Sequence, residues 1–218
     1  MILNFNFLPK YVGMILQGCE VTLILVVSCL VLGFGLGLVF ALFRQSNSKF
    51  LRGFSSVWVN VLRNTPFLLQ LFFFFYGLPQ LGISTTPLVT SIIALSINSS
   101  APNCEVIRSG LMSVKKGYYE CAYSLGYSKF QTFVYFIIPI SLRLSFKSLV
   151  NNFVNLALTS SVCYSTTLME ITGVAKTVVG RVSRPFEVYL LILILYCVFT
   201  YVISFISKAI DRKIHIVL

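Results

Sequence analysis

Residues 188–207 read VYLLILILYCVFTYVISFIS, a run of twenty residues without a charged side chain. About 20 consecutive apolar residues are what a helix needs to cross the hydrocarbon core of a bilayer. The whole 218-residue chain is 57% hydrophobic and only 11% charged, whereas about a quarter of the residues of a soluble domain are charged. The stretch therefore predicts an integral membrane protein.

Four further segments are long and apolar enough to span, and they lie at roughly 18–43, 55–77, 88–108 and 144–164. We therefore predict an all-α membrane protein with about five transmembrane helices, in one domain over 12–210 with a tail at 211–218. Pro66 should kink the second span, because proline removes a helical hydrogen bond. Gly33, Gly35 and Gly37 should let a neighbouring helix approach the first span closely.

Lysines and arginines predict the orientation of these spans. With the N-terminus outside, four basic residues lie in outer segments, and Arg63 is too deep to assign. The inner segments then hold twelve: Arg44, Lys49, Arg52, Arg108, Lys115, Lys116, Lys129, Arg143, Lys147, Lys208, Arg212 and Lys213. The positive-inside rule thus favours an outer N-terminus and an inner C-terminus. Because the basic residues flank apolar runs, the net charge of +11 indicates orientation and not nucleic-acid binding.

This orientation places the longest polar insertion, residues 109–143, in the cytoplasm between the third and fourth spans. It reads SGLMSVKKGYYECAYSLGYSKFQTFVYFIIPISLR. Residues 118–125 can form a short amphipathic helix, with Tyr119, Ala122 and Tyr123 toward one side. Gly126 should then permit a sharp turn. Ser128 can cap a second short helix, and Pro139 should break or kink the chain as it re-enters the membrane.

The insertion carries a recognisable pattern: Glu120-Cys121-Ala122, three residues, Gly126, and Pro139 after an apolar run. It resembles the coupling loop of ABC importer permeases, which reads Glu-Ala-Ala, three residues, Gly, nine residues, Ile-x-Leu-Pro. Phe136 and Ile138 stand at the positions of that Ile and Leu. The resemblance implies that this loop docks on an ATP-binding subunit. Glu120 would complement the dipole of the first short helix or meet a basic residue of that partner.

Further similarities narrow the family to polar amino-acid permeases, the histidine/glutamine/arginine branch. Residues 62–71, LRNTPFLLQL, resemble the branch's Phe-Arg-Gly-Thr-Pro-Leu-Leu-Val-Gln, and residues 105–110, EVIRSG, resemble its Glu-Ile-Val-Arg-Gly-Gly. The resemblance implies a bacterial inner-membrane permease that works by alternating access. Its expected partners are ATP-binding subunits, a second permease as homo- or heterodimer, and an external solute-binding protein. The outer segment, about 170–187, is the expected contact for that binding protein.

The sequence indicates a transport subunit and not an enzyme. The chain has no Gly-Lys-Ser or Gly-Lys-Thr phosphate loop, so ATP and Mg²⁺ are expected on a partner chain. The only histidine, His215, lies three residues before the end and cannot serve as a base for a serine in mid-membrane. We predict no catalytic residue, no metal site and no cofactor in this chain.

Polar side chains inside the spans indicate where cargo passes, because such groups usually face a bundle interior or a cavity. The predicted path residues are Asn98, Glu105, Asn151, Asn155 and Thr159. Hydrogen bonding between helices is the competing interpretation for these polar side chains. Glu105 has two roles open to it as well: a structural ion pair with Arg108 three residues on, or a lining and gating role.

One departure from the family bears on cargo. The family usually has Leu-Leu-Lys-Asp/Glu/Asn-Thr-Ser where residues 156–161 read LALTSS, and Pro102 replaces the usual aromatic. Without an acid at Thr159, glutamine or a similar neutral polar amino acid is favoured, although basic amino acids stay possible. The competing hypothesis is a membrane scaffold or regulator that docks an ATPase without transporting. It would keep the 109–143 loop but would not need polar stripes.

Overall fold

The computed structural model describes the backbone of residues 3–215 and the side chains of residues 3–212, and every regular element in that part of the chain is a helix. The long elements are α1 (Leu8–Gln45), α4 (Pro87–Met112), α7 (Ile138–Thr159) and α9 (Pro185–His215). The shorter ones are α2 (Lys49–Arg63), α3 (Phe67–Gln80), α5 (Lys116–Ser124), α6 (Lys129–Thr132) and α8 (Ile171–Val182). A π-helical turn, Phe133–Ile137, joins α6 to α7, and a 3₁₀ segment, Ser160–Thr166, follows α7.

Three helices are long and apolar enough to cross a membrane: α1, the continuous helical stretch Lys129–Thr166, and α9. The bent pair α2 and α3 raises the number to four if it forms one span. The remaining predicted span, 88–108, coincides with α4, which is helical but too polar to qualify by composition. Because α4 is packed against α1, α2, α3 and α7, much of its surface faces protein, where polar side chains can be accommodated.

The contact between α1 and α4 is the most extensive in the described structure. It depends on Gly33 and Gly37, which lie one turn apart on the face of α1 toward α4. A Cβ at Gly33 would overlap the side chain of Ser99, and a Cβ at Gly37 would lie 2.6 Å from Cβ of Asn103. Nothing lies within 4 Å of such an atom at Gly35. The close-packing prediction is thus confirmed for two of the three glycines and wrong for Gly35.

The second predicted span is not one kinked helix. The chain leaves α2 at Arg63, and α3 begins at Phe67 with an angle of 104° between them. Pro66 is extended at the N-cap of α3, with ψ 135°. A proline disfavours helical geometry in the residue before it and has no N–H to donate to the preceding turn, so α2 does not continue through Thr65 and Pro66. The bend places Asn60 and Arg63 on a different helix from Gln70.

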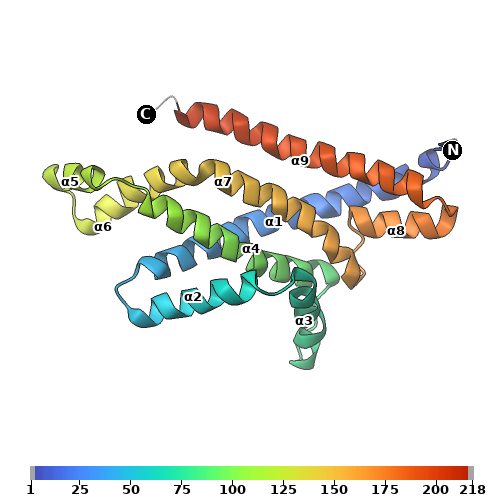
Figure 1. The fold of residues 1–218 in the computed structure, drawn as a ribbon. Coiled ribbons are helices and arrows are strands. Elements are labelled where there is room, and N and C mark those ends of the chain that lie inside the picture. The colour runs from blue at the N-terminus through green and yellow to red at the C-terminus, as the bar shows by residue number, and fades with distance from the viewer. Residues whose placement is uncertain (1–2, 216–218) are drawn as a thin grey trace.

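The two ends of the molecule differ in character (Figure 1). The short helices α5 and α6 lie at one end, near the C-terminal end of α9, and α8 lies at the opposite end beside the N-terminus. Residues 211–215 continue α9 as helix, so the part of the predicted tail that the structure describes is helical. The side chain of His215 and residues 216–218 lie outside the described residues.

The glycine contact predicts which substitutions the bundle tolerates. Gly37→Leu should destabilise the chain by about 1–3 kcal/mol or more, because the added side chain must push α4 away from α1. Gly35→Leu should be neutral, since that face of α1 is open. The apparent thermal midpoint of each variant in mild detergent checks this, and equal midpoints for the two variants would contradict the packing argument.

Candidate coupling segment and translocation path

The predicted amphipathic helix is present as α5, and Gly126 ends it with φ +85°. The Tyr127 amide donates to the Ala122 carbonyl at 3.2 Å, and the Gly126 amide donates to the Tyr123 carbonyl at 3.0 Å. This pair of bonds is the Schellman arrangement, which requires a left-handed residue and so favours glycine. The sequence-based prediction of a sharp turn at Gly126 is confirmed.

The second short helix begins as predicted at Ser128. Its hydroxyl accepts from the Gln131 amide, and Gln131 Oε1 accepts from the Ser128 amide at 2.9 Å, which makes a complete capping box. For Pro139, which was expected to break or kink the chain, the structure shows a continuous helix. No break occurs there, because Pro139 lies in the first turn of α7 and the preceding π-helical turn, closed by the Ile138 amide and the Phe133 carbonyl, carries the helix past it.

The side chains of α5 separate into an inner and an outer set. Ala122 is buried, and Tyr119 packs against the core beneath it. Tyr123 is exposed, so only part of the side predicted to carry Tyr119, Ala122 and Tyr123 is buried. Glu120 and Cys121 are also exposed, and Glu120 falls outside the first turn of α5, which removes the proposed helix-dipole role. The outer side of α5 therefore presents aromatic and polar side chains at the surface.

Glu105 forms the ion pair with Arg108 that spacing predicted, at 3.2 Å. A second, shorter bond was missed: Nη2 of Arg44, at the end of α1, donates to Glu105 Oε1 at 2.8 Å. All three side chains are partly buried, with Glu105 24% exposed. The sequence could not show this contact because 61 residues separate its members. The triad ties α1 to α4 close to the coupling segment.

Asn98 contacts a different helix. Its Nδ2 donates to Oε1 of Gln70 on α3 at 3.0 Å. Gln70 Nε2 in turn donates to the Leu62 carbonyl at 3.0 Å and to Oγ1 of Thr65 at 2.7 Å. The side-chain amide of Gln70 thus bridges the break between α2 and α3, and its bond to Asn98 ties this break to α4. Asn98 takes part in fixing the bend, whatever contact with cargo it makes.

On α7, Asn151 and Asn155 are exposed and Thr159 is partly exposed, on one face as the spacing predicted. The Thr159 hydroxyl donates to the Asn155 carbonyl within the same helix, at 2.7 Å. Asn152, which directly follows Asn151 in the chain, instead donates to Asn103 Oδ1 of α4 at 3.2 Å. The side-chain amides of Asn151 and Asn155 are thus exposed in a single chain, whereas the half-buried amide of Asn152 joins α7 to α4.

The predicted path residues do not share one cavity within the chain. Glu105 lines a polar cleft of about 240 Å³ between α4 and α7. Asn151 lines a separate groove between α7 and α9. Asn98 is held at α3, as described above. No group of three or more histidine, cysteine or acidic side chains within the described residues is placed to hold a metal ion.

A buried carboxylate at the far end of the molecule was also missed. Glu170 caps α8, accepting from the amides of Thr172 at 2.9 Å and Gly173 at 2.8 Å, and Tyr196 of α9 donates to it at 2.9 Å. Burial raises the pKa of this carboxyl, against the lowering effect of those hydrogen bonds. The Ile171 amide donates to Thr22 of α1, so this corner joins three helices. The sequence signal that could have revealed this cap is an acidic residue, Glu170, before a hydrophobic run.

The long helices expose apolar faces and surround the more polar α4. This arrangement is that of a membrane protein with several spans. The family model of the binding-protein-dependent transport system inner membrane component matches residues 33–216. The chain therefore belongs to this family of ABC transporter permeases.

Individual proteins agree with this assignment. The putative glutamine transport system permease protein GlnP of Rickettsia conorii is 32% identical, over 95% of each chain. The L-cystine transport system permease protein TcyL of Bacillus subtilis is 29% identical, over 97% of this chain and 91% of its own. The crystal structure of an amino acid ABC transporter with histidines superposes with a TM-score of 0.88 at 30% identity, covering 98% of this chain and 100% of that one.

The Schellman turn yields a test of the coupling segment. Gly126→Leu should cost about 1–2 kcal/mol locally, because a side chain disfavours positive φ, and nothing within 4 Å would clash with it. We expect ATP-driven uptake to be lost while membrane insertion is retained. Gly126→Asn, which tolerates this backbone geometry, should keep most uptake. Normal uptake by the leucine variant would contradict a coupling role for the turn.

The ionic triad yields a second test, which separates its two possible roles. Glu105→Gln should lower stability by about 1.5–3 kcal/mol, because it removes hydrogen bonds between charged groups, whereas Glu20→Gln at an exposed site should not. Adding Arg44→Gln should recover part of the loss, which the thermal midpoint in detergent measures. If the stabilised double variant also transports, Glu105 is structural, and if it is stable but inactive, Glu105 acts in gating.

Proposed function

We propose that the chain is the transmembrane permease subunit of an ATP-driven importer of polar amino acids, with a neutral cargo such as glutamine favoured over basic amino acids. Relatives named for glutamine and L-cystine transport support an amino-acid cargo. The observation that carries the proposal is the continuous helical stretch Lys129–Thr166. It connects the coupling segment at one end to the exposed amides of α7 further along.

This connection supplies a mechanical route for alternating access. Nucleotide binding closes the partner ATPases, which move the docked α5. The capping box and Schellman turn fix α5 to α6, and α6 continues through the π-helical turn into α7. Movement at α5 is thereby passed to the helix that bears Asn151 and Asn155. Hydrolysis of ATP, with its Mg²⁺, takes place on the partner chain.

The exposed amide face supports a second permease, identical or related, as partner. Asn151, Asn155 and Thr159 are uncovered in one chain, and polar groups at membrane depth need partners or a water-filled cavity. Two permeases facing each other enclose such a cavity. Amides and a hydroxyl hydrogen-bond a neutral polar side chain, whereas a cationic cargo would favour an acid, which this face lacks.

The proposed topology has five spans, with the N-terminus outside and the coupling segment and C-terminus in the cytoplasm of a bacterial inner membrane. The placement of α5 and α6 at the end opposite the N-terminus and α8 supports this arrangement (Figure 1). At the outer end, Glu170 and Glu187 are buried, while Lys176 and Arg181 of α8 are exposed. We therefore assign the contact with the external binding protein to basic side chains of α8.

Uptake by proteoliposomes tests this function. The full chain, reconstituted with its ATPase and binding protein, should accumulate glutamine in an ATP-dependent manner from a panel that includes cystine, histidine, arginine and leucine. Accumulation of arginine in preference to glutamine would overturn the cargo assignment. An assembled complex that hydrolyses ATP but takes up no amino acid would favour the scaffold hypothesis.

A pair of asparagine variants tests the path on α7. Asn155→Leu should raise the KM for cargo about fivefold, the equivalent of one hydrogen bond, without loss of stability. Asn152→Leu should instead lower the thermal midpoint, since it breaks the bond to Asn103, and should leave the substrate profile unchanged. If Asn155→Leu changes neither KM nor substrate preference, this face serves for packing only.

A further inference from the structure

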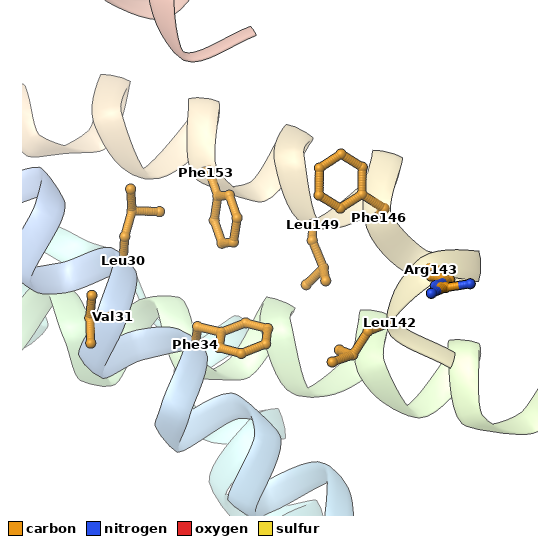
Figure 2. Close-up of a pocket in the computed structure, with 8 residues that line it drawn as sticks. All are labelled: Leu30, Val31, Phe34, Leu142, Arg143, Phe146, Leu149 and Phe153. Carbon is orange, nitrogen blue, oxygen red and sulfur yellow. The ribbon is translucent and has the colours of Figure 1, made fainter. Parts of the chain in front are cut away.

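We propose that the groove between α1 and α7 holds one acyl chain of an anionic phospholipid, with the lipid phosphate bound by Arg143. The groove has a volume of about 460 Å³ and is lined by Leu30, Val31, Phe34, Leu142, Arg143, Phe146, Leu149 and Phe153. Figure 2 shows the apolar side chains along the two helices and Arg143 at one end. Apart from that arginine, every lining residue is apolar. This proposal rests on the membrane orientation given under the proposed function.

The dimensions of the groove fit a lipid tail in one leaflet. Arg143 and Phe153 are ten residues apart on α7, which corresponds to about 15 Å along the helix axis. This is half of the roughly 30 Å hydrocarbon core, and Arg143 lies at the end of α7 nearer the coupling segment. The charged end thus falls at the cytoplasmic headgroup level, and the apolar part extends to about the middle of the bilayer.

The positive charge of Arg143 indicates that the occupant of the groove carries a negative charge. Its side chain is partly buried, and no ion pair or hydrogen bond joins it to another described residue. A guanidinium binds phosphate through two parallel hydrogen bonds, and basic pockets between spanning helices on the cytoplasmic side bind anionic headgroups. A lipid phosphate therefore supplies the missing counter-charge at the depth where the arginine lies.

The adjacent groove between α7 and α9 makes a useful contrast. It contains two lysines, Lys147 and Lys208, but it also contains Asp211. That groove carries an acid of its own, whereas the groove at Arg143 has none among its lining residues. Phe146 lines both grooves and separates them. Of these two grooves, the α1–α7 groove combines an apolar lining with a charge that no acidic lining residue offsets.

A second copy of the chain is a poorer occupant. It has six acidic residues, and four of them are already engaged within the chain: Glu105, Glu170, Glu187 and Asp211. Of the other two, Glu120 lies on α5, and Glu20 lies in the N-terminal half of α1, away from the end that carries Arg44. Neither lies at the depth of Arg143 in an antiparallel or parallel packing of spanning helices.

Native mass spectrometry of the purified full chain, titrated with phosphatidylglycerol in mild detergent, tests the proposal without cargo or ATP. Arg143→Ala should weaken retention of phosphatidylglycerol about fivefold, the effect of one basic residue near a membrane surface. Arg52→Ala, which removes an exposed charge from α2, should not change it. Equal retention by all three proteins, or an equal fall in both variants, would overturn the proposal.

Two further variants identify the occupant directly. Val31→Trp fills the groove while keeping the arginine, so loss of retained phosphatidylglycerol is expected here as well, and unchanged retention would count against the acyl-chain position. Val31→benzoylphenylalanine, irradiated in the bacterial membrane, should give a lipid adduct by mass. A covalent dimer of the chain instead would show that a second copy occupies the groove. Because these readouts do not involve uptake, they can fail while the transport function holds.

Discussion

The structure depends on covering the polar helix α4 with the apolar helix α1 and with the other helices packed around it. Lipid offers no hydrogen bonds, so the serines and asparagines of α4 must find partners in protein. Gly33 and Gly37 let α1 lie against α4 closely enough to cover them. The bonds from α4 to Gln70 and Asn152 complete the enclosure on other sides. The apolar faces of α1 and α9 are then left for the lipid.

In the proposed function, the same enclosure provides the frame through which a partner ATPase drives the movement. The triad at Glu105 fixes α1 to α4 at the coupling end, while Glu170 joins α8, α9 and α1 at the other. Between these two fixed corners, α7 is the helix that extends directly from the coupling segment. In the proposed mechanism, this frame with one continuous helix converts a push at α5 into a rotation or shift of α7 at depth.

Sequence reasoning succeeded where local chemistry decides the structure. Four of the five spans predicted from apolar runs are each a helix in the structure. Gly126 and Ser128 correctly predicted the turn and the helix cap between α5 and α6, because caps depend on residues a few positions apart. It failed where distant residues meet. The pairing of Arg44 with Glu105, the bond from Asn98 to Gln70 and the inward face of Asn152 all depend on helix rotation, which a periodic pattern leaves undetermined. At Pro66 a kink was predicted, but the separation into two helices at 104° was not.

The π-helical turn before Pro139 has a consequence for how the chain tolerates change in length. A π turn accommodates one residue more than an α turn, and one residue corresponds to about 100° around a helix. Deleting a single residue from 133–137 would therefore turn the π turn into an α turn and leave the orientation of α5 and α6 relative to α7 nearly unchanged. A deletion within the α-helical part of α7 would instead swing α5 and α6 by about 100° around the helix axis, so the π turn is a place where the connection tolerates the loss of one residue.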